Sequence, residues 1–233
     1  MIFRQLFDND TSTYTYLLGC ERSRRAVLID TVHYHLDHYI ELLEKLNLRL
    51  YYTLETHVHA DHITCASLLR GTLGSKSVVH RDAGARCADL LVTDGVWLQV
   101  GDLELTVRHT PGHTDGCVSY VMADRVFTGD ALFIDGCGRT DFQQGDPGRL
   151  YDSIQRQLFT LPPDTLIYPG HDYNGNTVST IGREMAKNPR LGGGKNRDEF
   201  IALMNGLDLP HPRHIAEALP ANQACGQPAP RHG

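Results

Sequence analysis

The sequence lacks several features that mark other classes of protein. It has no run of 18 apolar residues, so no helix is predicted to cross a membrane. Its net charge of −6 does not supply the basic face that nucleic-acid binding needs, so no nucleic-acid partner is expected. The first residues contain no long apolar segment, and we therefore expect no secretory signal.

Cysteine is also scarce. The chain has 6 cysteines in 233 residues, and none of them form a Cys-x-x-Cys pair. This pattern argues against a disulfide framework and predicts free thiols in a cytoplasmic protein. The hydrophobic fraction of 41% and the length fit one domain over residues 1–233. Roughly the last eight residues are expected to be loosely ordered.

Hydrophobic patterns predict a chain of mixed strands and helices. Apolar or β-rich runs predict strands at 3–7, 13–18, 26–30, 50–55, 77–80, 97–100, 103–107, 117–121, 125–130 and 165–168. Helical spacing of apolar residues predicts helices near 36–47, 63–69, 147–160, 178–187 and 198–207. The tail from Pro210 is rich in proline and polar residues, and no helix is predicted there.

One short segment concentrates side chains that bind metals. His57, His59, Asp61 and His62 lie within six consecutive positions, directly after the apolar run at 50–54. Imidazole suits zinc, iron, nickel and copper, and the added carboxylate leaves iron and zinc as the leading choices. The alternative is a solvated histidine-rich turn, which this composition would rarely produce by chance.

Other predicted strands also end close to a side chain that can bind a metal. His113, Asp130 and His171 each follow such a strand, and Asp30 ends an earlier one. Strand ends can gather at one edge of a sheet, although each residue alone could be an ordinary polar group at a strand end. For Asp30, the edge of a site and the cap of a turn are equally good interpretations.

Together these motifs resemble the metallo-β-lactamase superfamily. The resemblance rests on T-H-V-H-A-D-H at 56–62, H-T-P-G-H-T at 109–114, F-T-G-D at 127–130 and Y-P-G-H-D at 168–172. It implies an α+β chain folded as an αββα sandwich, with two mixed sheets flanked by helices and a metal site at one sheet edge. The architecture follows from the resemblance and not from the spacing of residues.

Within that superfamily the chain is similar to the persulfide dioxygenases. The matching stretches are G-C-G-R-T-D-F-Q-Q-G at 136–145, H-D-Y at 171–173, T-V-S-T at 177–180, N-P-R-L at 188–191 and L-P-A-N at 219–222. This similarity implies an enzyme that oxidises glutathione persulfide with O₂ to sulfite and glutathione, using one Fe(II) per subunit. The alternatives are a two-metal thioester hydrolase of the glyoxalase II type and a non-enzymatic metal-binding module. A homodimer is the assembly we consider.

The same similarity implies a role for each residue of the site. The iron ligands are His57, His113 and Asp130, two imidazoles and a carboxylate on one face of the ion. The residues that match the second metal of the hydrolases, or that orient ligands, are His59, Asp61, His62, His171 and Asp172. The residues expected to contact glutathione are Arg139, Asp141, Tyr173 and Arg183. Arg139 is the leading clamp for a glutathione carboxylate, and its alternative role is an ion pair with Asp141. No catalytic role is expected for Cys137.

Overall fold

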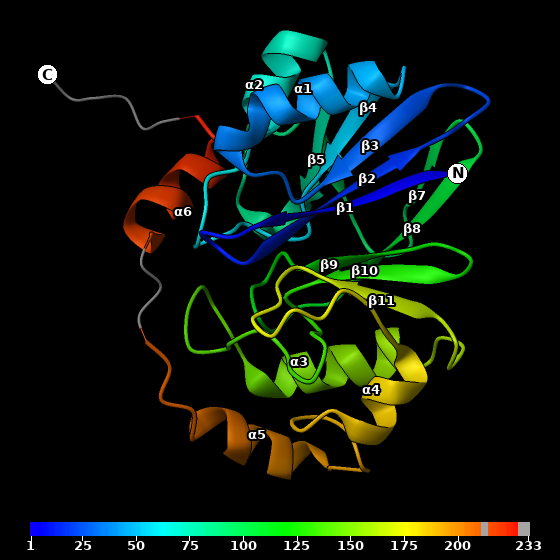
Figure 1. Cartoon of the computed structure of the whole chain (residues 1–233). Coiled ribbons are helices and arrows are strands. Elements are labelled where there is room, and N and C mark those ends of the chain that lie inside the picture. Colours follow the sequence, from blue (N-terminus) through cyan, green and yellow to red (C-terminus); the bar gives the residue numbers. More distant parts are fainter. Residues whose placement is uncertain (211–213, 228–233) are drawn as a thin grey trace, which may run out of the picture. The chain divides into compact units, whose positions relative to one another are not determined.

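The computed structural model describes residues 1–210 and 214–227. The chain divides into two compact units (Figure 1). The first consists of Met1–Val92, Gln99–Glu104 and the described part of His211–Gly233, and the second of Thr93–Leu98 and Leu105–Pro210. The expectation of one domain over 1–233 stays a prediction. The expected loose end lies largely outside the described residues.

The first unit is built on a six-stranded mixed sheet with the order β1-β2-β3-β4-β5-β6. Neighbours from β1 to β3 are antiparallel, and those from β3 to β6 are parallel. The strands are β1 (Ile2–Asp8), β2 (Thr13–Gly19), β3 (Arg25–Ile29), β4 (Arg49–Leu54), β5 (Lys76–His80) and β6 (Leu90–Val92). The helices are α1 (Leu36–Lys45), α2 (Ala66–Leu73) and α6 (Ile215–Gln223), with short 3₁₀ turns at His33–His35 and Arg81–Ala83.

The core of the first unit lies where α1 and α2 pack on the sheet. Tyr39 and Leu43, on the apolar stripe of α1, belong to one buried cluster with Leu17, Leu28 and Leu69. Each such side chain contributes about 1.5–3 kcal/mol when it leaves water. The cluster therefore fixes the strands whose ends carry the site residues.

The other mixed sheet has the order β12-β11-β10-β9-β8-β7 and belongs to the second unit except for residues 99–104 in β7, β8 and the turn that joins them. The β10–β11 pair is parallel, and the β8–β9, β9–β10 and β11–β12 pairs are antiparallel. The strands are β7 (Trp97–Val100), β8 (Leu103–His109), β9 (Val118–Val121), β10 (Arg125–Gly129), β11 (Leu166–Pro169) and β12 (Ser179–Thr180). The helices are α3 (Pro147–Ser153), a π-helical turn (Ile154–Leu158), α4 (Ile181–Lys187) and α5 (Arg197–Asn205).

Helix starts in this unit follow their capping residues. Asp146 caps α3 by accepting from the amide of Arg149, and Thr180 caps α4 in the same way. The helix predicted from residue 178 therefore begins only after Thr180, because the cap residue itself is extended. Asn196 and Glu199 form a capping box at α5.

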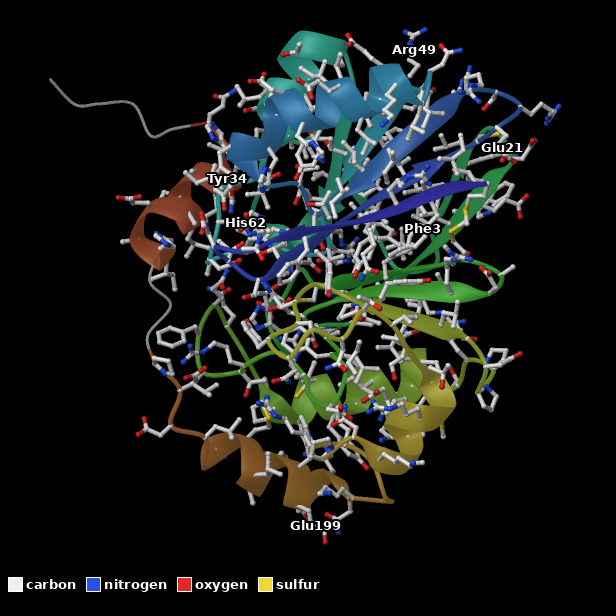
Figure 2. All side chains as sticks on the ribbon, in the orientation of Figure 1. Phe3, Glu21, Tyr34, Arg49, His62 and Glu199 are labelled. Carbon is white, nitrogen blue, oxygen red and sulfur yellow. A yellow bond between two sulfur atoms is a disulfide. The ribbon has the colours of Figure 1, made fainter. Side chains whose placement is uncertain are left out.

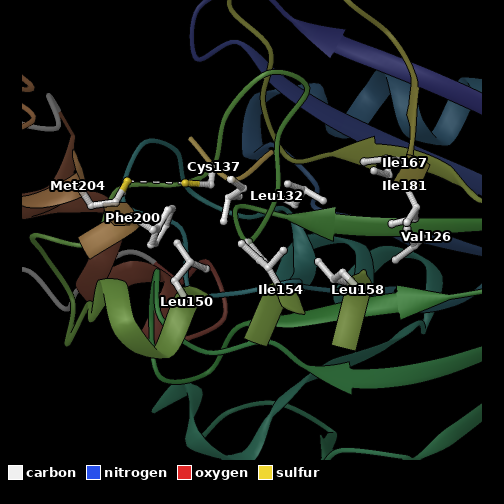
Figure 3. Close-up of a cluster of buried hydrophobic side chains, with 12 residues drawn as sticks. Val126, Leu132, Cys137, Leu150, Ile154, Leu158, Ile167, Ile181, Phe200 and Met204 are labelled. Carbon is white, nitrogen blue, oxygen red and sulfur yellow. Dashed lines mark hydrogen bonds between the residues drawn. The ribbon is translucent and has the colours of Figure 1, made fainter. Parts of the chain in front are cut away.

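One apolar cluster holds the second unit together (Figure 3). Leu150, Ile154 and Leu158 lie along one face of α3 and the π-helical turn, and pack with Val126 and Ile167 of the sheet. Phe200 and Met204 extend the cluster from α5, where the Cys137 Sγ lies 3.8 Å from the Met204 Sδ.

The first unit differs from the sequence predictions in three places. Cys87 and Cys225 form a disulfide across a sequence separation of 138, so the cysteines are not all free thiols. A pairing over that distance leaves no local spacing signal. The tail contains α6, although Pro220 lies inside it and removes one helix hydrogen bond. The helix predicted at 63–69 begins instead at Ala66.

Within 1–210 and 214–227, no helix has the length and apolar character that a membrane span requires.

Candidate metal centre

The histidine loop of the first unit begins where two parallel strands end. β3 and β4 are neighbours with Ile29 opposite Leu54, so Asp30 leaves the sheet beside the loop at residues 55–62. Asp30 is 1% exposed and accepts from the amide of Thr56 at 2.7 Å and from its hydroxyl at 2.8 Å. Asp30 therefore fixes the start of the loop.

The side chain of Thr56 sets the tautomer of His57. The single hydroxyl proton of Thr56 is donated to Asp30, so at a separation of 3.0 Å the Nδ1 of His57 must be the donor to that hydroxyl oxygen. Neutral His57 then carries its lone pair on Nε2. An imidazole whose Nδ1 donates a hydrogen bond keeps its Nε2 unprotonated, which is the form that binds a metal.

His59 is held through its other ring nitrogen, Nε2, whereas His57 is held through Nδ1. Its Nε2 lies 3.2 Å from Asp30 Oδ1 and 3.3 Å from Glu55 Oε2. Its Nδ1 is buried and has no hydrogen-bond partner among the residues that the structure describes. Burial by itself would lower the pKa of His59, but the charges of Asp30 and Glu55 raise that pKa well above its usual value.

His62 follows the same pattern as His57. Its Nδ1 donates to Asp61 Oδ2 at 2.9 Å, and Asp61 also accepts from the hydroxyl of Thr13 at 3.1 Å. The Nε2 of His62 is buried and, within the described part of the chain, has no hydrogen-bond partner. Figure 2 shows His62 among the side chains of the first unit, in contrast to exposed Glu199 on α5. The loop thus presents several imidazoles, each tied to oxygen through one nitrogen.

In the second unit, Asp130 lies between two histidines. β10 and β11 are parallel with Gly129 opposite Pro169, so Asp130 and His171 leave adjacent strand ends. Asp130 Oδ2 lies 3.6 Å from His113 Nε2, and Asp130 Oδ1 lies 3.5 Å from His171 Nε2. Two atoms bound to one ion at about 2.1 Å each lie about 3–3.5 Å apart, so both spacings suit metal ligands.

A backbone carbonyl orients His113. Its Nδ1 donates to the carbonyl oxygen of Arg139 at 2.7 Å, which leaves the lone pair of the neutral ring on Nε2, toward Asp130. Asp130 Oδ1 is buried without a hydrogen-bond partner in the described residues. Buried nitrogen and oxygen atoms left unsatisfied are rare in proteins. Those of His59, His62 and Asp130 are the donor types that iron or zinc takes, so the residues fit a metal.

The remaining predicted residues play different parts. Asp172 accepts from the amides of Asn174 at 2.8 Å and Asn176 at 2.7 Å, which fixes the turn that carries Tyr173. Tyr173 is 70% exposed, and its ring stacks on His171 with centroids 6.0 Å apart. An exposed ring at this position is free to meet a ligand from solvent.

Both predicted arginines are engaged in ion pairs. Arg139 donates to both oxygens of Asp141 at 2.7 Å and to the carbonyl of Pro210 at 2.7 Å. That pairing is the alternative role considered for Arg139 from the sequence, and its use as a substrate clamp stays a prediction. Arg183 donates to Asp135 and Glu184.

Sequence reasoning missed three residues that shape the histidine loop. Thr56 and Glu55 contact His57 and His59 as described, and Asn222 of α6 bonds to the loop from far along the chain. In the sequence the L-P-A-N stretch at 219–222 is only a point of similarity, because no local pattern links it to the loop.

Comparisons with known proteins identify the family to which these motifs belong. The profile described as "Metallo-beta-lactamase superfamily" matches residues 8–171. "Persulfide dioxygenase ETHE1, mitochondrial" from Homo sapiens is 49% identical over 233 residues, covering 99% of this chain and 91% of that protein. The crystal structure of ETHE1 from Myxococcus xanthus superposes with a TM-score of 0.95 at 53% identity, over 97% of this chain and 100% of that one.

A hydrolase is a more distant relative. "Hydroxyacylglutathione hydrolase" from Neisseria meningitidis is 35% identical over 198 residues, which cover 77% of each chain. The two mixed six-stranded sheets with their helices, together with these matches, confirm the predicted α+β class of the metallo-β-lactamase type.

Proposed function

Because the chain belongs to the metallo-β-lactamase superfamily and, within it, to the family of ETHE1 persulfide dioxygenases, we propose that it oxidises glutathione persulfide with O₂. The outer sulfur takes both atoms of dioxygen, and water cleaves the sulfur–sulfur bond. One persulfide, one O₂ and one water thus give glutathione and sulfurous acid, which ionises to sulfite. The observation that carries this proposal is 49% identity across 99% of the chain.

We assign one Fe(II) per subunit to His57, His113 and Asp130. The tautomers that their hydrogen bonds impose on the two histidines, with Nε2 unprotonated, support this choice, as does the spacing of His113 and Asp130. When bound, ferrous iron would activate triplet dioxygen for reaction with sulfur, and the sulfur itself gives up the four electrons that dioxygen takes. Asp30, through Thr56, and the carbonyl of Arg139 then hold the two imidazoles in place.

We rank the candidate glutathione contacts by how readily each side chain can reach a ligand. Tyr173 comes first, because its ring is exposed and stacks on His171. Arg139 with Asp141, and Arg183, stay candidates for the peptide carboxylates. Each arginine would have to bind substrate while keeping, or exchanging, its present ion pair.

Location and assembly are also proposals. We retain the cytoplasm on composition, although the human relative is named mitochondrial, and we retain a homodimer as the assembly. The disulfide removes two cysteines from the thiol argument for a reducing compartment, so the cytoplasmic location now depends on the other four being free.

A two-metal thioester hydrolase is the second candidate function. The observation that favours it is Asp130 between His113 and His171, the position of a carboxylate that bridges two ions. The loop also keeps His59, Asp61 and His62. Two metals would activate a bridging water for attack on a thioester.

Metal analysis with two substrates separates these functions. Protein purified without oxygen should hold about one iron per chain and consume O₂ on addition of glutathione persulfide, more so after Fe(II) is supplied. Two metals per chain with hydrolysis of S-lactoylglutathione, and no O₂ uptake, would reverse the assignment.

A ligand variant completes the test. His113→Ala should lose both iron and O₂ uptake, whereas His38→Ala, at an exposed position of α1, should lose neither. O₂ uptake that survives in His113→Ala would remove His113 from the ligand set.

A further inference from the structure

The side chain of Asn222 on α6 bonds to both ends of the segment that carries the last two histidines of the loop. Its Nδ2 donates to the backbone carbonyl of His59 at 2.8 Å and to that of His62 at 2.7 Å. Its Oδ1 accepts from the amide of Thr64 at 2.8 Å. Asn222 is 5% exposed, so these bonds form out of contact with solvent.

Only a primary amide can make this set of bonds. Two donors and one acceptor must lie in one plane, which excludes a hydroxyl, a carboxylate and an apolar side chain. The three backbone groups belong to His59, His62 and Thr64. They are buried, so each of them needs a hydrogen-bond partner within the protein. A buried polar group left unsatisfied is costly, so the loop conformation depends on this amide.

The helix that carries Asn222 is fastened beside the loop in three ways. The Cys87–Cys225 disulfide ties its end covalently to the segment after β5. The carbonyl of Cys225 accepts from the amide of Ser67 at 3.0 Å, and Leu219 packs with Val58 and Val79. A cavity of only about 10 Å³ lies between the loop and Asn222, which leaves room for one water at most.

We propose that Asn222 is a positioning residue for the metal centre, and that the Cys87–Cys225 disulfide holds the helix that carries Asn222 in place. The amide fixes the backbone on both sides of Asp61, and so fixes the directions in which His59 and His62 point. The ring of His59 lies against that of the assigned ligand His57, with centroids 4.1 Å apart, so the amide also restrains the ligand. The inference rests on the proposed function only in taking this loop to be a metal-binding loop. It assigns a role in metal retention to a helix that contributes no ligand of its own.

A matched pair of variants tests the amide. Asn222→Asp keeps the size of the side chain but removes both donors, and Gln223→Glu makes the same amide-to-carboxylate change at an exposed neighbour on the same helix. We expect Asn222→Asp to weaken metal binding about 10- to 100-fold, as loss of ligand-orienting groups does elsewhere. Gln223→Glu should leave binding within twofold of wild type.

The readouts are metal affinity by anaerobic titration against a chelator, and the visible spectrum of the Co(II)-substituted protein. A merely structural role would lower the melting temperature and leave the Co(II) bands in place, whereas a positioning role moves them. Equal affinity and equal Co(II) spectra in wild type and Asn222→Asp would overturn the inference.

The disulfide is tested by Cys87→Ala and by reduction with a dithiol. In reduction the sulfur–sulfur bond breaks, each cysteine gains an electron and a proton, and the dithiol closes to a cyclic disulfide. Either treatment should speed metal loss in wild type. In Asn222→Asp it should add nothing, because the tether acts through the amide. Additive effects would refute that link.

These experiments distinguish a failure of the positioning role from a failure of the proposed function. Wild-type protein that binds no iron and consumes no O₂ refutes the dioxygenase assignment. Wild-type protein that binds zinc in place of iron, and loses it in Asn222→Asp, still supports the positioning role. If Asn222→Asp does not fold, Cys87→Ala carries the test with the same metal titration, and unchanged affinity there counts against the proposal.

Discussion

The Nδ1 atom of His113 lies 2.7 Å from the backbone carbonyl oxygen of Arg139, a residue 26 positions later in the chain. This bond turns the Nε2 of His113 toward Asp130 Oδ2, 3.6 Å away. The carbonyl can come so close because Gly138 precedes it. A Cβ at Gly138 would lie 2.4 Å from the backbone oxygen of Asp130 and 3.1 Å from the His113 ring. The absence of a side chain thus shapes two predicted ligands.

Gly138→Ala should therefore strip the centre of metal. The added methyl group would push apart the segments that carry His113 and Asp130, and we expect iron content to fall at least tenfold, with O₂ uptake falling in proportion. Gly136→Ala is the control, because its nearest neighbour would be the Phe133 Cβ at 3.9 Å. Iron measured by mass spectrometry should separate the two. Full iron in Gly138→Ala would mean that the loop yields without disturbing the ligands.

Thr56→Val should weaken iron binding without unfolding the protein. Valine keeps the shape but removes the hydroxyl that links Asp30 to His57, so the orientation and tautomer of His57 lose this restraint. We expect about a 10-fold loss of iron affinity in a chelator titration.

The control is Thr53→Val on β4. The hydroxyl of Thr53 is buried without a hydrogen-bond partner among the described residues, so its removal should stabilise the protein by about 1 kcal/mol and leave iron binding unchanged. If both variants bind iron as wild type does, the hydroxyl of Thr56 does not orient His57.

The sequence predicted those parts of the site that local patterns encode. Apolar runs located the strands β3, β4 and β10, and the polar residues Asp30, His57 and Asp130 follow them as expected. Asp30 combines the two interpretations that the sequence left open, because its carboxylate caps the loop start and also contacts His59.

Contacts between distant segments could not be predicted in the same way. The amide of Asn222 meets the carbonyl of His59 across 163 positions, and Cys225 meets Cys87 across 138. Neither pair has a sequence spacing that would indicate it. Pro220 lies inside α6, and a proline at that position favours a loop over a helix when only the sequence is considered. The ion pairs of Arg183 are likewise tertiary, since Asp135 lies on another segment.

Tyr173 and Arg139 should respond differently to substitution. Tyr173→Ala removes an exposed ring, so stability should hold while KM for glutathione persulfide rises about three- to tenfold. Arg139→Met breaks the bond set to Asp141 and Pro210, so the free energy of unfolding should fall by about 1–2 kcal/mol. Denaturant titration and steady-state O₂ uptake measure both quantities. A large rise in KM at full stability for Arg139→Met would establish the arginine as a substrate clamp.

Alkaline pH should destabilise the second unit through Cys137. Its thiol is 2% exposed against Met204, and burial raises its pKa to about 11, although Arg190 acts in the opposite direction. The thiol form is favoured in the folded chain, so this contribution is complete below the unfolded pKa of about 8.5 and is lost as pH rises toward 11.

Unfolding titrations at pH 7 to 10.5 should show wild type losing about 2 kcal/mol relative to Cys137→Ala. The comparison is made as a difference because Tyr39 and Cys65, whose pKa values burial also raises, contribute equally to both proteins. Parallel pH profiles would show that the Cys137 thiolate is tolerated in the fold.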